Sequence, residues 1–181
     1  YPTGGVQPGI EQEFTLYVRP VFGPDNPGFD QITLRSTSSE PLELSQVQMG
    51  NDDALRFGVG SLLWPGGQLE VSRGEEGAVS VRFPAAVTGG NQVYAFRFST
   101  RVFLQSTVFS VQLQSSKQPE LLQEVVGGDA TQVVATQSLS VVSRLTENSL
   151  LEDVQVEPNA ITPNGDGTVS YTHLTLPTIA L

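Results

Sequence analysis

The sequence predicts an all-β protein, folded as an antiparallel β-sandwich of about nine to eleven strands. Apolar and polar residues alternate in many short segments, which is the pattern of strands with one buried face. Turn signals rich in Gly, Pro, Asn and Asp separate these segments at intervals of roughly 8–12 residues. No stretch keeps the period of about 3.6 residues that marks a helix, so we expect little helix.

The first two expected strands follow an entry linker rich in Gly and Pro, residues 1–10. Residues 11–22 form the first strand, which Pro20 ends or places at a sheet edge. A compact turn at residues 23–28 precedes the second strand, residues 29–36. Phenylalanine and aliphatic residues in both strands are the candidate core.

The next segments have less regular spacing. Residues 42–49 form a strand whose apolar positions change phase, which indicates a β-bulge near Ser45 and Gln46. A polar turn at residues 51–53 follows. The short apolar segment 62–64 then ends at a Pro-Gly-Gly turn.

The middle of the chain carries the clearest strand patterns. A Gly-Glu-Glu-Gly loop connects residues 68–73 to residues 78–83, which predicts a hairpin. In residues 91–104, aromatic residues alternate with small or polar ones, and a bulge is expected before Val102. Residues 107–114 follow through a short turn, and we expect their apolar row to form one side of another hairpin.

The remaining expected strands are shorter. Residues 121–126 and 132–135 lie on either side of a Gly-Gly-Asp-Ala turn. Residues 138–142 and 151–156 complete the expected sandwich, which spans residues 11–157.

A Pro-flanked stretch follows, in which residues 158–167 read Pro-Asn-Ala-Ile-Thr-Pro-Asn-Gly-Asp-Gly. The prolines favour extended backbone, and Asn-Gly and Asp-Gly are tight-turn dipeptides, so the stretch suits a junction between domains. It resembles the opening of the C-terminal immunoglobulin-like modules of large secreted bacterial proteins, of the flagellar hook-capping-like and gliding-motility-associated, type IX secretion kinds. The resemblance implies an immunoglobulin-like or cohesin-like sandwich at residues 11–157, then an interdomain linker and the truncated start of a second module at residues 158–168.

The same resemblance implies a role and a location. The chain is then a non-catalytic structural or adhesion module of a large exported bacterial protein, extracellular or at the cell surface. The implied partners are neighbouring domains of the same polypeptide, and polysaccharide or protein at the cell surface.

The last residues of the chain do not resemble a natural protein segment. Residues 169–178, Val-Ser-Tyr-Thr-His-Leu-Thr-Leu-Pro-Thr, resemble a translated sequencing adapter. The transposon mosaic end used in library preparation, with its standard extension, encodes these residues in order in one frame. We therefore interpret residues 169–181 as adapter-derived, leave them out of the expected fold, and expect the chain to be a piece of a longer protein.

The composition excludes several classes of site. The chain carries 19 Asp and Glu against 9 Lys and Arg, a net charge of −10, and such a chain repels the phosphates of nucleic acids. It has no cysteine, and its one histidine, His173, lies in the adapter-like segment. We therefore expect no Ser-His-Asp triad, no Cys-His nucleophile and no ordinary zinc site. No apolar run approaches the ~20 residues of a membrane-spanning helix.

Calcium is the one cofactor for which the sequence offers candidate ligands. Asp25, Asn26 and Asp30 belong to one proline-containing turn, and Ca²⁺ favours carboxylate and carbonyl oxygens. The alternative is that these side chains shape the turn through local hydrogen bonds. The polar turn at residues 51–53 has the same two interpretations. Because each loop supplies few carboxylates, we do not expect folding to require calcium.

Two other functions remain open. Tyr17, Trp64 and Tyr94 together offer a sugar-stacking platform if they share an exposed face, as in a carbohydrate-binding module of a secreted hydrolase. Alternatively, residues 164–167 resemble part of a dockerin calcium loop, which would follow a cohesin-like domain. Thr162 then occupies the first ligand position, which departs from that pattern.

No catalytic residue is predicted. Glu75 and Glu76 are adjacent glutamates, but glycoside hydrolysis needs two acids about 5–10 Å apart on either side of one bond. Neighbouring residues on a hairpin loop point apart into solvent instead.

Overall fold

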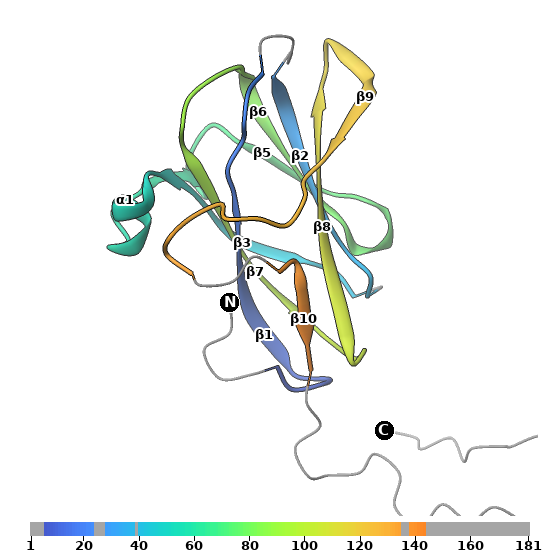
Figure 1. Ribbon diagram of the computed structural model, residues 1–181. Helices are drawn as coiled ribbons and strands as arrows, with labels where there is room; N and C mark the ends of the chain where they lie inside the picture. The colour runs from blue at the N-terminus through green and yellow to red at the C-terminus, as the bar shows by residue number, and fades with distance from the viewer. Residues whose placement is uncertain (1–5, 24–27, 39, 135–137, 144–181) are drawn as a thin grey trace, which may run out of the picture. The chain divides into compact units, whose positions relative to one another are not determined.

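The computed structural model describes residues 6–23, 28–38, 40–134 and 138–143 (Figure 1). Within these residues the chain forms ten β-strands, one short α-helix and one 3₁₀ turn. The strands are β1 (Glu11–Val18), β2 (Phe29–Ser36), β3 (Glu43–Gly50), β4 (Ser61–Trp64), β5 (Glu70–Arg73), β6 (Val79–Val87), β7 (Val93–Arg101), β8 (Ser106–Ser115), β9 (Gln118–Glu124) and β10 (Ser140–Val142). The helix is α1 (Asp52–Arg56), and the 3₁₀ turn is η1 (Glu75–Gly77).

The strands form two antiparallel sheets. One sheet has the order β1-β7-β3-β4, and the other has the order β10-β8-β2-β6-β5, with β9 also paired to β8. The predicted fold class, an antiparallel β-sandwich of nine to eleven strands, is therefore confirmed.

The core lies between the two sheets and follows the alternation in the sequence. In β1, β2, β7 and β8, most apolar residues that point to the inner sheet face lie in or against one cluster, because successive side chains of a strand point to opposite sheet faces. Phe14, Phe98 and Phe109 meet in this cluster from both sheets, with ring centroids 5.3–5.9 Å apart. Aromatic pairs of this kind stabilise a core by about 0.5–1.5 kcal/mol each beyond the area that they bury.

Two local predictions are confirmed. The register of β3 against β7 shifts between Leu44 and Gln46, where the sequence indicated a bulge. The predicted hairpin is β5–β6, whose registered pairs run from Glu70 opposite Arg82 to Arg73 opposite Val79.

The predicted hairpin between residues 91–104 and residues 107–114 is wrong. β7 ends at Arg101 and β8 begins at Ser106, but the two strands belong to different sheets. The apolar rows of both strands face the same core from opposite sides, so the short connection crosses from one sheet to the other. Residues 102–104 are not part of a strand, and neither are residues 132–134, the described part of the segment expected at 132–135.

The helix α1 replaces the polar turn expected at residues 51–53. Asn51 caps it, since the Asn51 side-chain oxygen accepts a hydrogen bond from the backbone N–H of Ala54 at 2.8 Å. The sequence therefore marked the position of the helix start, although it was interpreted as a turn.

The first and last described residues are paired. Val6 forms a parallel bridge with Ser143, and Ser143 donates a backbone hydrogen bond to Gln105 and a side-chain hydrogen bond to Leu104. Val6 is buried in the main core. The strand expected at residues 151–156 and the segments at 158–168 and 169–181 lie outside the described residues. In the described parts of the chain, no helix is long and apolar enough to cross a membrane.

Candidate functional site

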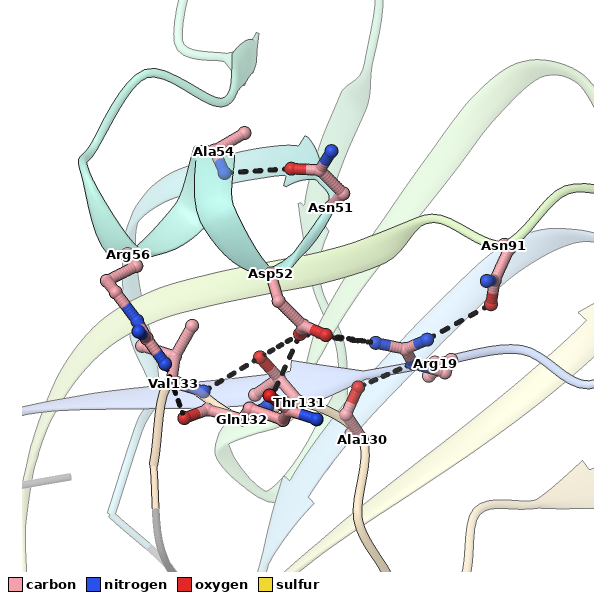
Figure 2. Close-up of polar contacts among 10 residues, drawn as sticks. All are labelled: Arg19, Asn51, Asp52, Ala54, Arg56, Asn91, Ala130, Thr131, Gln132 and Val133. Atoms are coloured by element: carbon pink, nitrogen blue, oxygen red, sulfur yellow. Dashed lines mark hydrogen bonds and ion pairs between the residues drawn. The ribbon is translucent and has the colours of Figure 1, made fainter.

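The densest polar cluster in the described residues surrounds Asp52, the first residue of α1 (Figure 2). It joins α1 to Arg19 just after β1, to Asn91 before β7, and to residues 130–133 between β9 and β10. We call this set of contacts the Asp52 clasp.

Arg19 makes contacts in three directions. Its Nη2 lies 3.0 and 3.2 Å from the two carboxylate oxygens of Asp52, and its Nη1 donates to the Asn91 side-chain oxygen at 3.1 Å. Its Nε donates to the backbone carbonyl of Ala130 at 2.6 Å. The Arg19 and Asp52 side chains are 25% and 30% exposed. A partly buried guanidinium with several acceptors is well suited to holding separate segments together.

Asp52 accepts further hydrogen bonds from the segment that follows β9. The Thr131 hydroxyl donates to Asp52 Oδ1, and the Gln132 backbone N–H donates to the same oxygen at 3.3 Å. The Thr131 hydrogen bond, together with Arg19 and the Gln132 amide, lowers the pKa of Asp52 below its ordinary value, although burial of the carboxyl opposes this shift. From the other end of α1, Arg56 donates to the Gln132 carbonyl at 3.3 Å.

The clasp fixes residues 130–133 against the outer face of the four-stranded sheet. Val93 and Ala95 of β7 alternate with core residues and therefore point to this outer face. Leu55 of α1 packs there with them, and Tyr17 and Val133 add partly buried surface. The clasp thus closes a second, small apolar cluster on the side of the sheet opposite the main core.

A cavity of about 410 Å³ lies along β1. Its walls come from β1, from individual residues of β7 and β8, from the end of β9, and from β10 and the connection that leads to it. The lining includes core residues such as Phe14 and Val18, with Arg19, Glu124 and Asp129 as its charged members. The described residues contain no group of three or more His, Cys, Asp or Glu placed to hold a metal ion.

Of the predicted calcium ligands, the structure describes only Asp30. Asp30 Oδ1 accepts the backbone N–H of Ser116 at 2.9 Å, and Asp30 Oδ2 accepts the Ser116 hydroxyl. The side-chain hydrogen bond from Ser116 is the main cause that lowers the pKa of Asp30. Asp30 thus ties the start of β2 to the turn between β8 and β9. Asp25 and Asn26 lie outside the described residues, so the calcium site stays a prediction.

The other acidic candidates lie in α1 and in η1. In residues 51–53, Asn51 caps α1 and Asp52 belongs to the clasp. Glu75 and Glu76 are exposed in η1, where Glu76 has a positive φ of 53°. These two glutamates therefore belong to a solvated turn.

The three aromatic candidates do not line one exposed face. Tyr94 is buried in the main core, and burial raises the pKa of its hydroxyl. Trp64 packs partly buried against the same core. Tyr17 packs on the outer face of the four-stranded sheet. The sugar-stacking platform that a carbohydrate-binding module would need is therefore not formed by these residues.

The sequence did not identify Arg19 or Thr131 as members of a site. Arg19 precedes Pro20 and was interpreted as the polar end of a strand, and Thr131 lies between two expected strands. No local pattern links two residues so far apart in the chain.

Comparisons with known proteins assign no family, since no protein-family model and no curated protein match the chain. Among solved structures, the chain is similar to ACE19, the collagen binding subdomain of the Enterococcus faecalis surface protein ACE. That match has 11% identity and a TM-score of 0.36, and covers 64% of this chain and 82% of that chain. The chain is also similar to the group B streptococcus pilus 2b backbone protein, with 9% identity and a TM-score of 0.41 over 79% of this chain and 55% of that chain.

A third similar structure is described as manganese lipoxygenase of Gaeumannomyces graminis with a partial structure of zonadhesin of Komagataella pastoris. Its identity is 16% and its TM-score 0.32, over 66% of this chain and 46% of that chain. TM-scores this low carry no argument about what the present chain does. The assignment of the fold depends instead on the observed strand pairing.

Proposed function

We propose that the chain is a non-catalytic structural or adhesion module of a large exported bacterial cell-surface protein. Its partners are neighbouring domains of the same polypeptide, and cell-surface polysaccharide or protein. The exported context is supported by the Pro-Asn-x-Ile-Thr-Pro-Asn-Gly-Asp-Gly stretch at residues 158–167, which resembles the start of a secreted C-terminal module.

One observation carries the structural part of the proposal. Two carboxylates that the sequence singled out hold loops in place through hydrogen bonds: Asp30 holds the turn after β8, and Asp52 holds residues 130–133. Carboxylates that accept several hydrogen bonds stay ionised and fix the backbone around them. This arrangement is what a rigid spacer or display module requires.

Surface labelling of the bacterium that carries the gene tests the location. Antibodies raised against this chain are expected to label intact cells, and an antibody to a cytoplasmic protein serves as the control. Labelling that appears only after the cells are permeabilised would overturn the proposal.

A binding assay distinguishes an adhesive role of the chain from a purely structural one. Beads coated with the chain are compared with beads coated with heat-denatured chain on surfaces that carry extracellular protein or polysaccharide. Retention of only the folded chain supports adhesion, and equal retention assigns the chain a structural role.

No observation in the described residues favours the carbohydrate-binding alternative, because Tyr17, Trp64 and Tyr94 lie in different environments. The dockerin alternative concerns residues 164–167, which lie outside the described residues. Calcium binding by Asp25, Asn26 and Asp30 is a further proposal, which titration calorimetry with Ca²⁺ tests directly.

A further inference from the structure

The cavity of about 410 Å³ lies between edge strands of the two sheets. β1 is an edge of the four-stranded sheet, β10 is an edge of the other sheet, and residues of both strands line the cavity. The connection after β9 crosses β1 and forms another wall (Figure 1). A volume of this size is within the range of about 300–1,000 Å³ that is usual for small-molecule pockets.

The floor of the cavity is aromatic. Phe14 of β1, Phe98 of β7 and Phe109 of β8 all line it, and their rings meet with centroids 5.3–5.9 Å apart. These three residues are at most 5% exposed, so they form the inner end of the cavity. Leu113 and Val141 add aliphatic surface to the lining. Because aromatic rings pack favourably on one another in offset or edge-to-face arrangements, this floor suits an aromatic ligand.

The mouth of the cavity is also apolar. Val21, which follows β1, and Val126, which follows β9, both line the cavity and are 84% and 83% exposed. Since these side chains belong to the lining and are exposed, they lie where the cavity opens to solvent. Exposed apolar side chains that border an apolar pocket are typical of ligand-binding grooves.

Charge decides which apolar ligand fits. Arg19 is the one basic residue of the lining, and its guanidinium is already paired with Asp52. The other charged residues of the lining are Glu124 and Asp129, and the whole chain has a net charge of −10. An anionic ligand would therefore be repelled from the cavity, whereas an uncharged one would not.

The Asp52 clasp holds one wall of the cavity in place. Ala130 and Thr131 belong to the lining. Arg19 Nε donates to the Ala130 carbonyl at 2.6 Å, and the Thr131 hydroxyl donates to Asp52. This wall is held by the protein's own contacts, so a ligand does not have to order it on binding.

We infer that this cavity binds an uncharged aromatic small molecule. The rings of the ligand pack on Phe14, Phe98 and Phe109, and its outer end lies between Val21 and Val126. This inference goes beyond the proposed function and does not depend on it.

A matched pair of dyes tests the inference. N-phenyl-1-naphthylamine is uncharged, and 8-anilino-1-naphthalenesulfonate has the same rings with an added sulfonate. Both dyes fluoresce more strongly in apolar surroundings, so titration of the full chain gives a dissociation constant for each. The uncharged dye is expected to bind the folded chain with a stoichiometry of about one, and about tenfold or more tightly than the sulfonate. The chain unfolded in urea is expected to show no saturable binding.

Substitutions locate the site. Val141→Phe enlarges a partly buried side chain that lines the cavity, and is expected to raise the dissociation constant of the uncharged dye about tenfold or more. Its melting temperature should not fall below that of the wild type, because the added ring fills existing space. Val126→Glu places a charge at the mouth and is expected to weaken binding similarly. Val59→Glu is the matched control: Val59 is 73% exposed but does not line the cavity, so this variant should bind like the wild type.

Three results would overturn the inference. They are the absence of saturable binding of the uncharged dye to the folded chain, an affinity for the sulfonate as high as that for the uncharged dye, and a Val59→Glu effect as large as that of Val126→Glu. Circular dichroism checks that each variant is folded. Val21→Glu, at the other exposed valine of the mouth, is an independent variant that gives the same test if Val126→Glu does not fold.

Discussion

Three hydroxyl groups lie buried in the sandwich without a hydrogen-bond partner in the described residues: those of Thr100, Thr107 and Ser115. A buried hydroxyl without a partner costs about 1–3 kcal/mol. Threonine nevertheless has the branched shape that suits a strand, so it fills the same space as valine. At the two threonine positions the shape of the side chain therefore fits the core, while the unpaired hydroxyl destabilises it.

Thr107→Val is therefore expected to stabilise the protein. Thr107 is fully buried and its hydroxyl has no partner, so replacing that hydroxyl with a methyl group should raise the free energy of unfolding by about 1 kcal/mol. Urea unfolding of the two proteins measures the difference. The control is Thr131→Val, which removes a hydroxyl that donates to Asp52 and accepts from the Val133 N–H, and which should be destabilising. A loss of stability in Thr107→Val would show that the hydroxyl has a partner.

At the scale of single elements, alternation predicted which face of a strand is buried. Residues 29–36 were expected as a strand and are β2, with Ile32 and Leu34 in the core. Alternation does not say which strand pairs with which, and this is why β7 and β8 were expected as a hairpin. α1 was missed because five residues are too few to show a helical period, even though Asn51 supplied a cap.

Asp52 holds the connection between β9 and β10 in place through the hydrogen bonds that it accepts from Thr131 and Gln132. Asp52→Asn removes the charge that pairs with Arg19 and is expected to lower the free energy of unfolding at pH 7 by about 1 kcal/mol. The pKa of Asp52 is lower in the folded protein than in the unfolded chain. Its carboxylate therefore stabilises the fold above the unfolded pKa of about 4, and this contribution is lost as the pH falls below it.

Urea unfolding of both proteins at several pH values measures this dependence. The difference between Asp52→Asn and the wild type should shrink as the pH falls below about 4. Asp53→Asn is the control, because Asp53 lies in the same helical turn, is exposed, and makes no side-chain contact in the clasp. An equal loss in the two variants would assign the effect to the helix terminus, not to the clasp.

The turn between β1 and β2, together with the start of β2, contains the candidate calcium ligands Asp25, Asn26 and Asp30. The melting temperature is expected to be the same, within a few degrees, in excess Ca²⁺ and in excess chelator. Asp30 already accepts two hydrogen bonds from Ser116, and the turn supplies few carboxylates for a calcium ion. A ligand bound only to the native state raises apparent stability. A clear drop on chelation, compared with the same chelator saturated with calcium, would therefore show that a calcium site supports the fold.

At the scale of the whole molecule, the contacts that sequence analysis could not predict are those between residues far apart in the chain. Arg19 and Ala130 are 111 positions apart, and their contact follows from the folded path of two sheets, not from any local pattern. The candidate ligands named from the sequence, by contrast, were all neighbours in single turns. Short-range patterns therefore predicted the sandwich and the acidic residues of interest, while the clasp that uses Asp52 required the fold.

The last prediction concerns the chain beyond the described sandwich. Among the described residues, the members of the main core and of the small outer cluster lie between Val6 and Val141, and the bridge between Val6 and Ser143 joins the two ends of this region. A chain that ends at Val156 is therefore expected to keep its free energy of unfolding within about 1 kcal/mol, because few buried contacts would be lost. Urea unfolding measures this, and a chain that ends instead at Ser138, which removes β10, is the destabilised control. If ending at Val156 unfolded the protein, the residues after Val156 would have to be integral to the fold.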